Sequence, residues 1–199
     1  MTDIPEVVDR VSRLDANGKL MVGALLLVRY CSIHRDPKFS PWFEREQQVL
    51  ARVVEVAKSL ARGDVGHVDL EGLREDLDGA LEASVPEGPA FQTEIVDHMV
   101  FATEVLDFLQ APDDASALTA ALERADELAE AHVGMGEEDH LADSWDEVDL
   151  SALEAELRGL DAIASEDSAA VLARSESFAR VYARLIEVYY TNEDAGIVD

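Results

Sequence analysis

Four side chains that are able to bind a metal lie within one short segment of the sequence. They are Glu94, Asp97, His98 and Glu104, and the residues between them are mostly apolar. Because residues three and four apart share one face of a helix, the three carboxylates fall along one stripe, and Glu94 and His98 form an i, i+4 pair. Carboxylates and imidazole are suitable ligands for a divalent cation. The stripe is therefore one candidate for a metal or small-ligand site, although it lacks the Glu-x-x-His spacing of di-iron helical bundles.

The same carboxylates also have a purely structural interpretation. A charged group on a buried helix is strongly destabilising unless it has a partner. Arginines are available in the preceding segments, at Arg29, Arg35 and Arg45. In this interpretation the acids form ion pairs with these arginines and bind nothing else.

A second group of metal-ligating residue types lies further along the chain. Glu137 and His140 form one Glu-x-x-His pair, and His132 lies eight residues before His140. A divalent ion is able to take two imidazoles and a carboxylate. However, Gly134 and Gly136 predict a loop here. His132 also has a structural explanation, because a histidine near a helix C-terminus interacts favourably with the helix dipole.

The residues around Trp145 are acidic and predict a protein-binding surface. Tryptophan is enriched at binding hot spots, so Trp145 is either an exposed anchor for a partner or an aromatic side chain that packs back on the protein. The residues predicted to contact a partner are Glu137, Glu138, Asp139, Asp143, Trp145, Asp146 and Glu147.

The net charge supports this surface and excludes several kinds of partner. The chain has 43 acidic and 16 basic residues, a net charge of −27. Residues 101–199 hold 25 acids and 5 bases, a net charge of −20, against −7 for residues 1–100. Such a chain lacks the basic footprint that binds nucleic acid or anionic membranes directly, and it attracts a basic protein. Adaptation to high salt, or a compositional bias of the genome, explains the same charge without any partner.

No motif for enzyme catalysis is present. The chain has no nucleophile elbow, phosphate loop or dinucleotide fingerprint, so we expect no cofactor and no catalytic residue. The one cysteine, Cys31, lies in an apolar segment and is expected to be buried and inert. Because the chain also starts without a secretory signal pattern, we expect a cytoplasmic protein.

The elements that must position these residues are all helices. Apolar residues repeat every three to four positions throughout, and no segment alternates with the period of a strand. Eight helices are expected in one compact all-α bundle, and the two most apolar, at about 16–33 and 90–109, are expected to be central. The other helices are expected at about 4–14, 40–62, 69–85, 114–133, 150–160 and 165–192. Residues 1–192 are expected to form a single domain, followed by an acidic tail at 193–199. Leucine seams, as at residues 70–81 and 150–160, can close within one bundle or across a homodimer.

Three stretches resemble a bacterial family catalogued as domain of unknown function 416. They are residues 67–73 leading to Val85 and Pro86, residues 97–104, and residues 144–146. The resemblance implies a compact all-helical domain. It implies no activity, cofactor or catalytic residue.

Together these patterns predict an acidic helical interaction protein, such as an immunity-like inhibitor or an accessory subunit that binds a basic protein. The alternative is a metal-binding or small-ligand-binding helical protein or enzyme, built around the cluster at residues 94–104. A third reading is a salt-adapted domain whose acidity serves only its solubility.

Overall fold

The computed structural model describes residues 4–32, 40–64, 66, 68–84, 90–136 and 168–191 of the chain. Within these ranges the chain forms seven α-helices and no strand. The helices are α1 (Ile4–Ser12), α2 (Ala16–Tyr30), α3 (Ser40–Ala61), α4 (Leu70–Ala83), α5 (Ala90–Gln110), α6 (Ala115–Gly136) and α8 (Ser168–Thr191). The all-α class expected from the periodicity is confirmed.

Aspartates set the starts of three of these helices. The side chain of Asp15 accepts a hydrogen bond from the backbone N–H of Gly18, and that of Asp69 accepts one from Gly72. Asp114 accepts one from the N–H of Ser116 at the start of α6. Each bond satisfies one of the backbone donors that a helix N-terminus leaves without a partner.

The end of α3 depends on a glycine. Gly63 has φ of +88°, in the left-handed region that residues with a side chain rarely adopt. The N–H of Gly63 bonds to the carbonyl of Leu60, and the N–H of Asp64 bonds to that of Ser59. These bonds close the last turn of α3 and start the connection to α4.

Helix α2 is buried over most of its length. Every residue from Val22 to Tyr30 is buried, and α2 packs against α1, α3, α5 and α8. A Cβ atom at Gly23 would lie 2.7 Å from Cδ2 of Leu109 on α5. Glycine at this position therefore allows α2 and α5 to approach closely.

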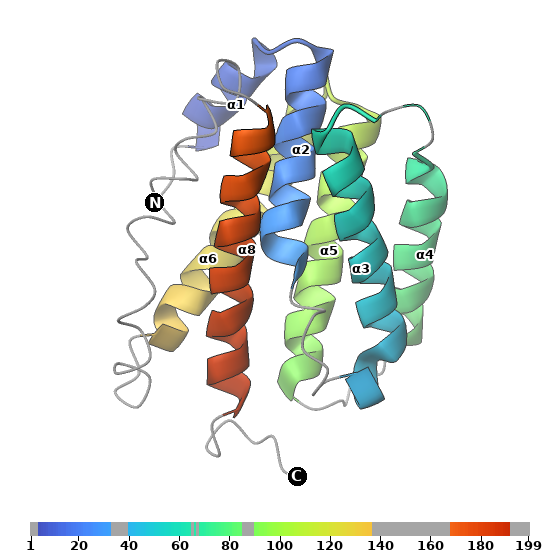
Figure 1. Ribbon diagram of the computed structural model, residues 1–199, viewed down its shortest axis with the longest axis vertical. Helices are drawn as coiled ribbons and strands as arrows, with labels where there is room; N and C mark the ends of the chain where they lie inside the picture. The colour runs from blue at the N-terminus through green and yellow to red at the C-terminus, as the bar shows by residue number, and fades with distance from the viewer. Residues whose placement is uncertain are drawn as a thin grey trace.

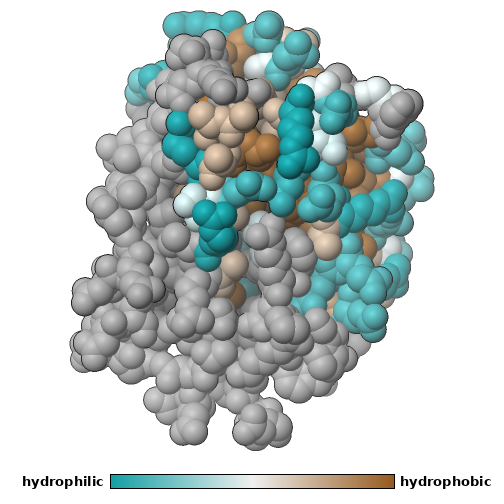
Figure 2. Space-filling model, in the orientation of Figure 1, coloured by the Kyte–Doolittle hydropathy of each residue, from teal (hydrophilic) through white to brown (hydrophobic). Residues whose placement is uncertain are grey.

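Figure 1 shows α2, α3, α5 and α8 with roughly parallel axes, while α6 crosses behind α8 at an angle. On the face shown in Figure 2, the described surface is mostly hydrophilic, and apolar atoms are visible between the polar side chains. Among the described residues, no helix combines the length and apolar character needed to cross a membrane.

The helix bounds agree closely with the expected ones but differ in places. Helix α6 continues through Gly134 to Gly136, so the loop that these two glycines predict is wrong for residues 134–136. Helix α2 ends at Tyr30, and a short 3₁₀ turn follows at Cys31 and Ser32, where the pattern predicts helix to residue 33. Helix α3 is kinked at Phe43, whose φ of −134° and ψ of 32° are not helical. The helix expected at 150–160 and the tail expected at 193–199 lie outside the described residues.

Candidate functional site

Two residues of the predicted metal cluster, Glu94 and His98, lie together inside the bundle. His98 is fully buried and Glu94 is 5% exposed. Nδ1 of His98 lies 2.6 Å from the backbone carbonyl oxygen of Glu94 and 3.3 Å from Oε1 of its carboxylate. A carbonyl oxygen can only accept a hydrogen bond, so Nδ1 carries the hydrogen.

The other ring nitrogen of His98 contacts α8. Nε2 lies 2.7 Å from the hydroxyl oxygen of Tyr182, which is also buried. In the neutral ring Nε2 is an acceptor, so the Tyr182 hydroxyl donates to it. Burial raises the pKa of Tyr182 well above its ordinary value, and the nearby Glu94 carboxylate raises it further. The hydroxyl therefore keeps the hydrogen that this bond needs.

A buried cation, Arg29, lies at the end of α2. Arg29 is 3% exposed, its Nε donates to Oγ of Ser175 at 3.0 Å, and its guanidinium lies 5.5 Å from the ring centre of Phe178. Each of these contacts joins α2 to α8. A buried cation is retained at lower cost when it has such partners.

Tyr30 lies at the centre of an aromatic cluster, and its hydroxyl is unusual. The rings of Phe101, Phe178 and Tyr182 lie 5.0–5.4 Å from its ring, centre to centre. The Tyr30 hydroxyl is buried and has no hydrogen-bond partner in the described part of the chain. Burial raises the pKa of both Tyr30 and Cys31 well above their ordinary values, so Cys31 is the buried, protonated thiol that the sequence predicts.

The other two residues of the predicted cluster are placed differently. Asp97 is half-buried and directly precedes His98 in the sequence, one turn after Glu94. Glu104 lies further along α5, where Oε2 is 3.5 Å from Nε of Arg124 on α6. This cation comes from a following helix and is none of the three that the structural interpretation names, Arg29, Arg35 and Arg45. Arg35 lies outside the described residues. Burial raises the pKa of Glu104, and Arg124 partly offsets this effect.

The structure therefore joins Glu94 and His98 but does not gather all four residues of the cluster. In the described ranges, no group of three or more His, Cys, Asp and Glu side chains is arranged to hold a metal ion. A cation at His98 would need the Nε2 lone pair that the Tyr182 hydroxyl occupies. Metal binding on this helix stays a prediction from the sequence.

The predicted partner-binding residues lie outside the described part of the chain. These residues are Glu137, Glu138, Asp139, Asp143, Trp145, Asp146 and Glu147, and the same holds for His140 and for the side chain of His132.

Of residues 101–199, the structure describes 101–136 and 168–191. Residues 104–127, named here the acidic stretch, contain seven acids and one base, Arg124. Lys19 pairs with Asp113 at 2.6 Å, and Arg74 pairs with Asp107 at 3.1 Å. Glu123 and Glu127 are exposed one turn apart on α6. The stretch therefore presents carboxylates to solvent even where bases from other helices reach it.

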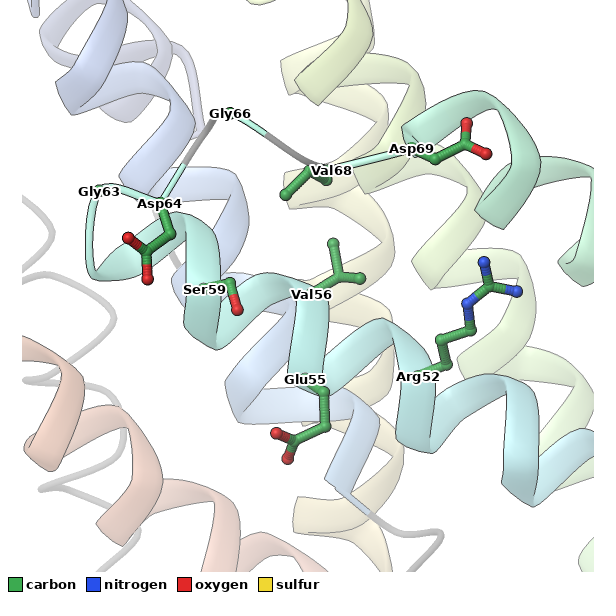
Figure 3. Close-up of a pocket in the computed structure, with 9 residues that line it drawn as sticks. All are labelled: Arg52, Glu55, Val56, Ser59, Gly63, Asp64, Gly66, Val68 and Asp69. Atoms are coloured by element: carbon green, nitrogen blue, oxygen red, sulfur yellow. The ribbon is translucent and has the colours of Figure 1, made fainter.

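One pocket lies on a different part of the molecule and was not predicted from the sequence. It has a volume of about 750 Å³ and lies between α3 and the connection from α3 to α4 (Figure 3). Figure 3 shows Val56 and Val68 pointing toward each other across it. The full lining is Arg52, Glu55, Val56, Ser59, Gly63, Asp64, Gly66, Val68 and Asp69. The sequence marks this region only as a helix stop and a helix cap, so it carries no signal for a site.

Comparison with protein-family models, with curated proteins and with solved structures finds no match to this chain.

Proposed function

We propose that this chain is an acidic all-helical interaction protein that binds a basic protein partner, as an inhibitor or an accessory subunit. The observation that carries the proposal is the uneven charge: residues 101–199 hold 25 acids and 5 bases. Net charge of this size governs association with other molecules rather than the choice of fold. The partner-binding surface is proposed at residues 137–147, which follow the acidic stretch in the sequence after nine further residues.

The acidic stretch supports this placement. Its carboxylates outnumber its bases seven to one, and Asp113 keeps 91% of its side chain exposed even though it pairs with Lys19. Carboxylates in water generate a negative potential that steers a basic partner toward the surface and raises the association rate. Salt screens this potential over a Debye length of about 10 Å at 0.1 M.

The proposal assigns separate roles to the interior and the surface of the bundle. We infer that α2 and α5 form its centre, which is supported by the burial of Val22 to Tyr30 on α2 and of His98, Met99, Phe101 and Ala102 on α5. The outer helices, α6 among them, then carry the exposed charge that steers a partner toward the surface at residues 137–147. We place this function in the cytoplasm, where a single free cysteine stays reduced.

Affinity capture at two salt concentrations tests the proposal. The tagged full chain is exposed to a lysate of its source organism at about 50 mM salt and is then washed at about 0.5 M. We expect one basic protein to be retained at low salt and released at high salt. Retention that does not depend on salt, or the retention of no basic protein, would contradict the proposal.

A further inference from the structure

We propose that α8 is a detachable helix, which leaves the bundle as one unit while α2 and α5 stay folded. Helix α8 lies beside α2 and also contacts α5 through Tyr182 and His98 (Figure 1). Its departure exposes the surface of α2 and α5 that it covers, without unfolding of the whole protein. The proposal concerns the interior of the bundle and does not depend on the partner proposed above.

Buried polar side chains gather where α8 meets α2 and α5. The Nε–H of Arg29 donates to Oγ of Ser175 on α8 at 3.0 Å. Nε2 of His98 lies 2.7 Å from the Tyr182 hydroxyl oxygen, and the Glu94 carboxylate is near enough to raise the pKa of Tyr182. Within the described ranges, most of the polar residues that are buried lie at this interface, namely Arg29, Glu94, His98 and Ser175.

These polar contacts attach α8 less firmly than apolar contacts would. A hydrogen bond within a protein replaces hydrogen bonds to water, so its net contribution to stability is small. Arg29, His98 and Ser175 regain water as a partner when α8 leaves, whereas an apolar face that leaves its partner gains only unfavourable contact with water. Helix α4 also packs on α5, and its buried residues are of the apolar kind: Leu73, Leu77 and Ala80.

The hydroxyl of Tyr30 supports the proposal independently. It is buried and has no hydrogen-bond partner in the part of the chain that the structure describes. The ring centres of Phe178 and Tyr182 lie 5.4 and 5.0 Å from that of Tyr30. A buried hydroxyl without a partner is destabilising, and a polar network that is only partly satisfied does not lock an interface. Because Phe178 and Tyr182 belong to α8, their departure opens Tyr30 to water and relieves this cost.

Apolar contacts and one ion pair keep α8 docked in the folded protein. Val171, Leu172 and Ile186 of α8 are buried, which removes apolar surface from water. Glu176 of α8 pairs with Lys58 of α3 at 3.2 Å. The docked state is therefore the populated one, and the detached state is a minor state of the kind that hydrogen exchange detects.

Native-state hydrogen exchange of the full chain tests the proposal. Amide exchange is followed by NMR at a series of low urea concentrations, where each rate reports the opening that exposes the amide. We expect the α8 amides to share one urea dependence, shallower than that of the α2 and α5 amides. Without urea they should exchange at least about tenfold faster than the α2 and α5 amides, after correction for intrinsic rates.

Two results of this experiment would overturn the proposal. If the α8 amides follow the same urea dependence as those of α2 and α5, then α8 leaves only when the whole protein unfolds. If the exchange of α8 does not depend on urea, then its amides open by small local fluctuations and the helix does not leave as a unit.

Gly23→Ala separates detachment from global unfolding. The added Cβ overpacks the contact with Leu109, which joins α2 to α5 and is present whether α8 is docked or detached. We expect the α2 and α5 amides to exchange about fivefold to 150-fold faster. The α8 amides should keep their wild-type rates, as long as α8 still exchanges faster than α2 and α5. Equal acceleration in all three helices would contradict a detachment that leaves the contact of α2 with α5 intact.

Two tyrosine variants test whether the polar contacts control the docking. We expect Tyr182→Phe to speed the exchange of the α8 amides by about fivefold to 150-fold, because the docked state alone has the bond to His98. The matched control is Tyr30→Phe, which removes a hydroxyl that makes no hydrogen bond among the described residues and should slow this exchange or leave it unchanged. Equal acceleration by the two variants would overturn the polar interface as the basis of detachment.

Discussion

The hydrogen bond between His98 and Tyr182 joins residues that are 84 positions apart in the chain, and both side chains are buried. Removing the Tyr182 hydroxyl takes away the hydrogen bond at the buried Nε2 of His98, and such a loss costs about 1–3 kcal/mol. Tyr30 lies in the same aromatic cluster, but its hydroxyl has no partner in the described part of the chain. Replacing each tyrosine with phenylalanine therefore compares the loss of a hydrogen-bonded buried hydroxyl with the loss of one that makes no hydrogen bond.

We expect Tyr182→Phe to lower the free energy of unfolding by about 1–3 kcal/mol. Tyr30→Phe should leave the stability unchanged or raise it, because it removes a buried hydroxyl that makes no hydrogen bond. Urea denaturation of the wild type and both variants measures the difference. Equal losses in the two variants would show that the hydrogen bond to His98 is not the source of the effect.

Glu104 should make the stability of the fold depend on pH. Burial raises its folded-state pKa above the unfolded value, despite Arg124. The folded state therefore binds this proton more tightly, and ionised Glu104 disfavours folding above its folded pKa. This unfavourable contribution is relieved as the pH falls through that pKa.

We therefore expect Glu104→Gln to raise the free energy of unfolding at pH 7, with an advantage over the wild type that shrinks toward pH 4. Denaturation curves at a series of pH values test this expectation. A variant that is less stable than the wild type at pH 7 would mean that the contact with Arg124 outweighs the cost of burying the carboxylate.

At the scale of helices, packing between α2 and α5 depends on a glycine. A Cβ atom at Gly23 would lie 2.7 Å and 2.9 Å from two side-chain carbons of Leu109, and 3.2 Å from Phe108. We expect Gly23→Ala to destabilise the fold by about 1–3 kcal/mol, because the added methyl group overpacks the interface. Gly66→Ala is the control, because nothing lies within 4 Å of its position. Thermal unfolding distinguishes the two variants, and equal melting temperatures would argue against this close contact.

Local features of the helices were predictable, because they depend on residues close together in the sequence. The caps at Asp69 and Asp114 and the stop after Ala61 follow from side chains and glycines within one turn of each boundary. The non-helical backbone at Phe43 was not predicted, since Pro41 in the first turn is compatible with a continuous helix.

Contacts between distant segments were not predictable in the same way. Periodicity shows which face of a helix is apolar, but it does not show which helix covers that face. The pairing of Glu104 with Arg124 and the bond between His98 and Tyr182 both depend on how α5 meets α6 and α8. The pocket of Val56 and Val68 depends likewise on the position of the connection after α3.

At the scale of the whole molecule, the net charge of −27 opposes compaction, because like charges repel one another in the folded state. The Debye length falls from about 10 Å at 0.1 M salt to about 3 Å at 1 M, so salt should weaken this repulsion. We expect the free energy of unfolding to rise between these concentrations of potassium chloride. A value that stays flat or falls would show that self-repulsion does not limit the stability.

Salt should have opposite effects on the stability of the fold and on partner binding. Measuring both effects distinguishes two explanations of the acidity, adaptation to salt and a partner-binding surface. Screening strengthens the fold by weakening repulsion within the chain. The same screening slows association with a basic partner by weakening attraction between the chains. A chain whose acidity serves only its solubility would show the first effect alone.

The most direct test of the central proposal is the rate of association with the captured basic protein, measured for two matched variants. One variant replaces Glu137, Glu138, Asp139 and Asp143 with amides, and the other replaces the exposed Glu44, Glu71, Glu75 and Glu82 with Gln. Both remove four negative charges, so they change the net charge equally. We expect the first variant to associate much more slowly at low salt and the second to remain close to the wild type. Equal rates for the two variants would contradict a binding surface in the acidic second half.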